Sequence, residues 1–118
     1  MNIEDFRDYC LLKPGTTDKT PFGPDTLVLK VGGKLFALTD INTFGSINLK
    51  CDPEGAAELR ELHEYVLPGY HMNKKHWNTV LIGTGATDRQ LREWIDHSYD
   101  LVVASLPRGV RAEITSSG

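Results

Sequence analysis

The chain has 118 residues, with 13 Lys or Arg against 16 Asp or Glu, and 40% of its residues are hydrophobic. This length suits one globular domain over residues 1–118 and excludes multidomain enzymes and solenoids. No apolar run is long enough to span a membrane, and the acidic start does not resemble a secretory signal. We therefore expect a cytoplasmic protein that makes no membrane contact.

The charge distribution is uneven. A formal net charge of −3 and a pI near 5.7 argue against a protein that binds nucleic acid over its whole surface. Residues 65–87 nevertheless contain Lys74 and Lys75 and no Asp or Glu, which makes one positive segment on an acidic body. Cys10 and Cys51 lack the spacing of a zinc ribbon or a redox pair, so we expect reduced core residues.

The first half of the chain predicts one helix and three strands. Asn2 can cap a helix over 3–13 that Pro14 ends, and the two prolines of 15–25 predict an irregular ordered loop anchored by Phe22. Alternation over 26–31 and 34–39 around Gly32-Gly33 predicts a tight hairpin. The strand 46–51 repeats the alternation, with Ile47, Leu49 and Cys51 on the core face and Asn48 and an exposed Lys50 on the other.

The second half predicts two helices around one strand. Asp52 caps a helix that ends before Pro68, with a stripe of Leu59, Leu62 and Val66. Trp77 to Ile82 has the composition of a strand. A capping box, Thr87 with Gln90, opens a helix that runs to Pro107, and 108–118 is expected to fray. The helical stripe comprises Leu91, Ile95, Tyr99, Val102 and Leu106.

This order of elements predicts an α+β fold, a single domain in which helices cover one face of an antiparallel sheet and leave the other open. The densest polar segment is 68–79. Lysines can contact phosphates, Asn and His can bond sugars, phosphates or bases, and Tyr or Trp can stack on unpaired bases. The alternative is a solvated loop in which Trp77 is buried as a core anchor.

Metal and nucleophile chemistry have weaker support. His71 and His76 point to opposite faces of an extended segment, although His63 and Cys51 could approach in the fold, so no metal is expected. Alternation puts Cys51 in the core, which argues against a catalytic thiol. His97 is interpreted as a hydrogen-bonded packing residue. We therefore expect a non-catalytic protein without a cofactor.

Several stretches together resemble the MmcQ/YjbR family of small bacterial proteins. The matching residues are 20–26 (TPFGPDT), 31–38 (VGGKLFAL), 48–53 (NLKCDP), 68–79 (PGYHMNKKHWNT) and 98–102 (SYDLV), with Leu106-Pro107. The resemblance implies a CyaY-like α+β domain whose curved antiparallel sheet forms a double-wing motif. It also implies the family label of DNA-binding protein and no known catalytic activity.

The leading hypothesis is weak, salt-sensitive DNA binding through the open sheet face and segment 70–78. The alternative is a protein or peptide-binding module on the same face or a sheet edge. A small-molecule site or an enzyme using His71, His76 or Cys51 is a third possibility. The candidate nucleic-acid contacts are Lys30, Lys34, Asn48, Lys50, His71, Asn73, Lys74, Lys75, His76, Trp77 and Asn78.

Overall fold

The computed structural model describes residues 1–21, 23–69 and 72–117. No helix among these residues is both long enough and apolar enough to cross a membrane. In chain order the elements are α1 (Ile3–Leu11), β1 (Thr16–Lys19), β2 (Thr26–Val31), β3 (Lys34–Asp40), β4 (Ser46–Lys50), α2 (Pro53–Leu62), β5 (Val66–Pro68), β6 (Trp77–Leu81), α3 (Asp88–Ser105) and α4 (Arg108–Ser117).

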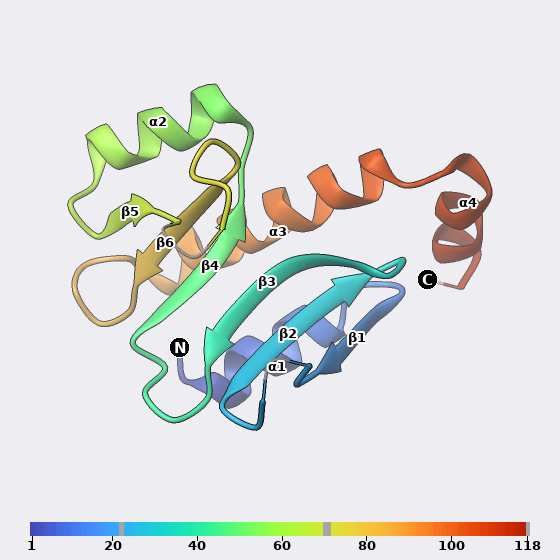
Figure 1. Ribbon diagram of the computed structural model, residues 1–118, viewed down its shortest axis with the longest axis horizontal. Coiled ribbons are helices and arrows are strands. Elements are labelled where there is room, and N and C mark those ends of the chain that lie inside the picture. Colours follow the sequence, from blue (N-terminus) through green and yellow to red (C-terminus); the bar gives the residue numbers. More distant parts are fainter. Residues whose placement is uncertain (22, 70–71, 118) are drawn as a thin grey trace.

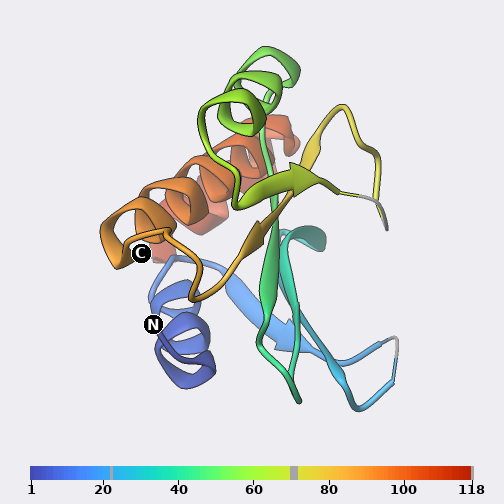
Figure 2. The same ribbon diagram turned by 90° about the vertical axis from the view of Figure 1, so that its left-hand side faces the viewer.

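The six strands form one antiparallel sheet in the order β1-β2-β3-β4-β6-β5. Helix α1 packs on β1, α2 on β5 and β6, and α3 on β2, β3 and β4. Figure 1 views the sheet with α1 and α3 behind it, and Figure 2 shows the helices gathered on one side. The predicted α+β architecture, with helices on one sheet face, is confirmed.

Strand register separates the two faces. Residues directly opposite each other in an antiparallel pair share a face. The helix-covered face carries the core residues Leu29, Ala37, Leu49 and Val80. The other surface, here called the open face, carries a row running through all six strands: Lys19, Val28, Leu38, Asn48, Thr79 and Leu67.

Strands β3 and β4 part beyond the pair Ala37 and Leu49. The hydroxyl of the fully buried Ser98, on α3, spans the opening. It donates to the Phe36 carbonyl oxygen at 2.5 Å and accepts from the Lys50 backbone N–H at 2.8 Å. Because buried backbone groups require partners, this hydroxyl replaces the ladder hydrogen bonds that the diverging strands cannot make.

Three helix starts follow the predicted caps. The side chains of Asn2, Asp52 and Thr87 accept backbone N–H groups in the first turns of α1, α2 and α3, and Asn2 and Thr87 form complete capping boxes. The predicted hairpin of β2 and β3 around Gly32-Gly33 is also confirmed. These signals are local, so the sequence pattern was sufficient to find them.

Two short edge strands depart from the predictions. The irregular loop expected over 15–25 contains β1, because Thr16 to Lys19 precede both prolines and pair with β2. Strand β5 was also missed, and Val66 belongs to it rather than to the helical stripe. Helix α2 stops at Leu62, whose side chain is 65% exposed rather than part of a buried stripe. Phe22 lies outside the described residues.

The C-terminal segment, which the sequence predicts to fray, is helical up to Ser117. Residues 108–117 form α4, and Ile114 is buried against the core. The turn of the β2–β3 hairpin packs closely against the junction of α3 and α4. A side chain at Gly32 would not fit there, since its Cβ would be only 2.6 Å from the Leu106 side chain. The positive φ of 58° at Gly32 also favours glycine. Tertiary contact with the hairpin therefore orders a segment whose own apolar pattern is sparse.

Ser98→Ala is expected to lower the free energy of unfolding by about 2–4 kcal/mol, because it leaves two buried backbone groups without a partner. Ser105→Ala is the matched control, since that hydroxyl donates only within its own helix, to the Val102 carbonyl oxygen. Urea unfolding of both variants measures the difference. Equal stabilities would contradict the role assigned to Ser98.

Candidate nucleic-acid interface

Four lysines lie toward one end of the sheet. Lys50, the last residue of β4, pairs in register with Trp77, the first residue of β6, on the open face. Lys30 faces the same side near the end of β2, opposite Leu35. Lys74 and Lys75 immediately precede β6. We call Lys30, Lys50, Lys74 and Lys75 the basic end of the open face.

The turn that carries Lys74 and Lys75 is internally held. The Asn73 side-chain oxygen accepts the Lys75 backbone N–H at 2.9 Å, and the Asn73 carbonyl oxygen accepts from the backbone N–H groups of His76 and Trp77. Arg60, in the last turn of α2, donates to the Lys74 carbonyl oxygen at 3.1 Å. Both lysine side chains are exposed. Arg60 was not a sequence candidate, since no local pattern links it to this turn.

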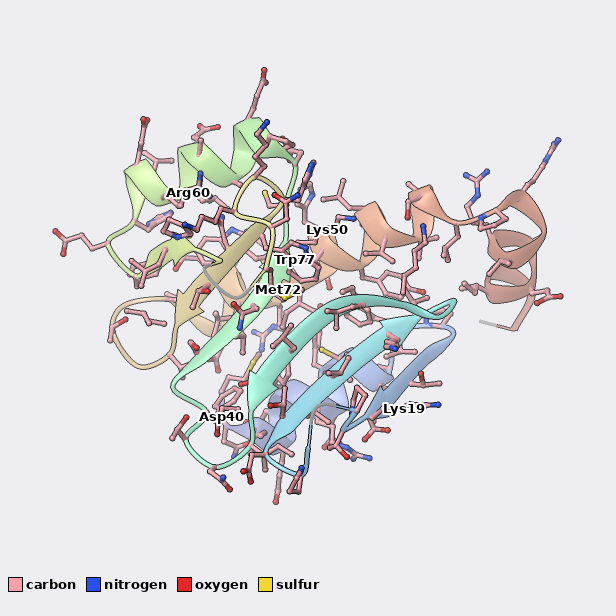
Figure 3. All side chains as sticks on the ribbon, viewed as in Figure 1. Lys19, Asp40, Lys50, Arg60, Met72 and Trp77 are labelled. Atoms are coloured by element: carbon pink, nitrogen blue, oxygen red, sulfur yellow. The ribbon has the colours of Figure 1, made fainter. Side chains whose placement is uncertain are left out.

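The opposite end of the open face is acidic. Asp40, the last residue of β3, accepts backbone N–H groups of Asn42 and Thr43, and the Asn42 amide donates to Asp25 at 2.9 Å. Figure 3 shows Lys50 and Asp40 at opposite ends of the region around β3 and β4. The described parts of the loops 20–25 and 69–76 both project on the side away from the helices (Figure 2). The described parts of two loops thus flank the open face, which carries Lys50 at one end, Asp40 at the other and Lys19 on the edge strand β1.

Three sequence candidates are buried. Asn48 lies on the open face as expected but is only 7% exposed, and its side-chain oxygen accepts the Thr79 hydroxyl at 2.6 Å. Trp77 is 8% exposed, as in the alternative interpretation of a buried anchor. Asn78 faces the helices, donates to the Ala56 carbonyl oxygen at 3.3 Å and accepts from Arg60 at 2.9 Å. These side chains stabilise the fold and are not presented to a ligand.

Two further sequence candidates, Lys34 and His76, do not lie together on the open face. Lys34 is opposite Val31 and approaches Ser105 of α3 at 3.5 Å, so it lies on the helix side and not on the open face. His76 is half-buried, and its carbonyl oxygen accepts the Cys51 backbone N–H at 2.7 Å. His71 lies outside the described residues. The structure therefore places Asn73 in the same turn as Lys74 and Lys75, and places Lys34 on the opposite face of the sheet from Lys30.

Cys51 and His97 meet at Asp52. Cys51 is buried, and this burial, reinforced by the Asp52 charge, raises the pKa of the thiol to about 11. The thiol donates to Asp52 Oδ1 at 3.7 Å, and His97 Nε2 lies 3.1 Å from the same oxygen. His97 is hydrogen-bonded as expected, but its side chain is 45% exposed rather than packed in the core. A protonated, buried thiol is a poor nucleophile at neutral pH.

The family model described as YjbR matches residues 11–101. The chain belongs to the YjbR family. YbdF of Escherichia coli O157:H7 is 42% identical over 89 residues, covering 75% of this chain and 73% of that protein. YjbR of Escherichia coli K12 is 34% identical, covering 94% of this chain and 95% of that protein.

Solved structures agree with this assignment. A Deinococcus radiodurans crystal structure with the family domain DUF419 matches with a TM-score of 0.90 and 37% identity, covering 97% of this chain and 88% of that one. A Pseudomonas syringae crystal structure matches with a TM-score of 0.74 and 32% identity, covering 86% and 98%. YbdF and YjbR are described as uncharacterized, so family membership assigns the fold and no ligand.

Asn78→Ala should lower the free energy of unfolding by about 1–3 kcal/mol, since it removes one of the two acceptors of Arg60 and a buried hydrogen bond to α2. Asn73→Ala, at an exposed position, should cost less than about 1 kcal/mol. Thermal and urea unfolding compare the two variants. A neutral Asn78→Ala variant would refute the structural role and return Asn78 to the candidate contacts.

Proposed function

We propose that the domain binds nucleic acid, specifically DNA, through its phosphates, using the basic end of the open face. The observation that carries this proposal is that Lys50, Lys74 and Lys75 lie where β4 meets β6 on a sheet surface that no described helix covers, with Lys30 at the same end of β2 across the opening between β3 and β4. Lys74 and Lys75 also belong to a segment without acidic residues. Lysine ammonium groups bind phosphate as point charges and release counterions from the duplex.

The same geometry favours contact with the backbone rather than recognition of bases. Side chains that could hydrogen-bond or stack on bases, namely Asn48, Trp77 and Asn78, are engaged in the fold. Phosphate contacts orient a protein on DNA without reading its sequence. Asp25 and Asp40 at the other end would repel the phosphate backbone and limit where it can lie. We therefore infer weak binding with little sequence preference.

The proposed role is binding without catalysis. Cys51, the candidate nucleophile of the sequence, is buried with a pKa raised to about 11, which opposes thiolate formation. The phosphate contacts proposed above need no chemical step from the protein. The double-wing description of the family fits this proposal, because the loops 20–25 and 69–76 flank the open face on the side away from the helices.

A protein partner is the second candidate. Apolar side chains on or beside the open face remain partly exposed, and they are Leu35, Leu38, Leu67 and Met72. Partly exposed apolar residues beside charged ones are common in protein interfaces. Such binding would depend on these residues and would respond little to salt. DNA binding would depend on the lysines and would weaken with salt.

A fluorescence-anisotropy titration with labelled duplex and single-stranded DNA tests the proposal. The wild type is expected to bind at low salt with micromolar or weaker affinity, and Lys50→Ala/Lys74→Ala/Lys75→Ala should lose at least tenfold. The control Arg89→Ala/Arg92→Ala/Arg108→Ala removes the same formal charge from exposed positions on α3 and α4 and should bind within about threefold of the wild type. Equal losses in both variants would contradict a specific surface.

The salt dependence provides a separate test. Four or five phosphate contacts predict a slope of about −4 for the logarithm of the binding constant against the logarithm of salt concentration. The triple variant of the basic end should reduce the magnitude of this slope by about 3, or one for each phosphate contact removed. Affinity that is independent of salt, or no binding to either form of DNA at low salt, would refute the proposal and favour a protein partner.

A further inference from the structure

Three side chains with metal-binding atoms converge on the helix side of the sheet, directly after Lys50 at the end of β4. Cys51 directly follows β4, Asp52 caps α2 and His97 lies on α3. Asp52 Oδ1 is 3.7 Å from the Cys51 sulfur and 3.1 Å from His97 Nε2. All three atoms lie within 4.8 Å of one another. We propose that Cys51, Asp52 and His97 bind a divalent transition-metal ion of the zinc class.

Two of the three ligand separations fit a tetrahedral ion, and the third, between the Cys51 sulfur and the His97 ring nitrogen, is within 4.8 Å. Zinc bonds of about 2.3 Å to sulfur and about 2.0–2.2 Å to nitrogen or oxygen imply tetrahedral ligand separations of about 3.6 Å for sulfur to oxygen and about 3.4 Å for nitrogen to oxygen. The separations from Asp52 Oδ1, 3.7 Å to sulfur and 3.1 Å to nitrogen, are each within about 0.3 Å of these values. A movement that brings the Cys51 sulfur and the His97 ring closer together would complete the geometry. On binding, the thiol proton would pass to solvent and the Nε2 proton of a neutral His97 would move to Nδ1, so that a thiolate and a ring-nitrogen lone pair face the ion.

The ligands are held by contacts outside the cluster. The other Asp52 oxygen accepts the Gly55 backbone N–H at 2.9 Å, which leaves Oδ1 directed at Cys51 and His97. The Cys51 backbone N–H is bound by the His76 carbonyl oxygen. Next to His97, the Ser98 hydroxyl joins α3 to β3 and β4. Such outer contacts orient metal ligands and raise affinity.

The surroundings combine an apolar wall with a path for the ion. Cys51 and His97 line a small pocket whose apolar wall is formed by Leu49, Leu59, Val80 and Trp94, and Lys50 and Asn78 complete the lining. The side chains of His97 and Asp52 are 45% and 50% exposed, so an ion can enter from solvent and keep a position for water. A donor set of sulfur, nitrogen and oxygen suits Zn²⁺ or Co²⁺ and does not suit Mg²⁺ or Ca²⁺, which prefer oxygen ligands.

Titration of the tag-free, reduced chain with Co²⁺ tests this site by absorption spectroscopy. One equivalent is expected to produce a thiolate-to-cobalt charge-transfer band and the strong visible bands of a tetrahedral ion, and Zn²⁺ should displace them. Cys51→Ser should abolish the charge-transfer band. Asp52→Asn and His97→Ala should each weaken Co²⁺ binding at least tenfold, and Asp52→Asn keeps a capping side chain.

Two controls keep the result interpretable. Cys10→Ser and His63→Gln alter a thiol and an imidazole outside the cluster, and both should keep the cobalt spectrum. If Cys51→Ser fails to fold, the more exposed His97→Ala variant decides, and Zn²⁺ should raise the Tm of the wild type but not of His97→Ala. A wild-type spectrum without charge transfer, unchanged binding by His97→Ala, or a spectrum lost in Cys10→Ser or His63→Gln would overturn the proposal.

Discussion

The two hydrogen bonds of Ser98 allow β3 and β4, which are neighbours in the sheet, to diverge at one end without leaving buried backbone groups unpaired. Beyond Ala37 and Leu49 the strands β3 and β4 separate, and a single hydroxyl from α3 satisfies one backbone group on each. This inserted contact lets α3 pack beneath both halves of the sheet while β4 and β6 turn away from β2 and β3. The end of β4, which carries Lys50, is therefore fixed by a side chain from another element.

Successive residues at the end of β4 serve opposite sides of the sheet. Lys50 faces the open surface, whereas Cys51 turns toward α3 and lies beside Asp52 and His97. The twofold alternation of a strand places these neighbours on opposite faces. Lys50 also lines the small pocket that contains Cys51 and His97, so the proposed phosphate surface and the proposed metal site adjoin in the structure as well as in the sequence.

The polar residues of segments 48–53 and 68–79, which carry the resemblance to the family, fall into a buried group and an exposed group. Asn48 and Asn78 satisfy partners within the fold, whereas Asn73, Lys74 and Lys75 form an exposed turn. Residue type alone could not separate these classes, because an amide can bond a backbone group as readily as a nucleotide. The separation required knowledge of which strands and helices lie opposite each side chain.

Local chemistry in the sequence determined the helix starts at Asn2, Asp52 and Thr87, the hairpin at Gly32-Gly33 and the buried stripe of α3, because caps, turns and periodicity act over a few residues. Tertiary structure decided the pairing of the edge strands β1 and β5, the helical conformation of α4 and the exposed position of Leu62. It also brought Cys51 and Asp52 to His97 and placed Lys34 on the opposite face of the sheet from Lys30. Strand pairing and helix packing join residues far apart in the chain, so short-range patterns do not contain this information.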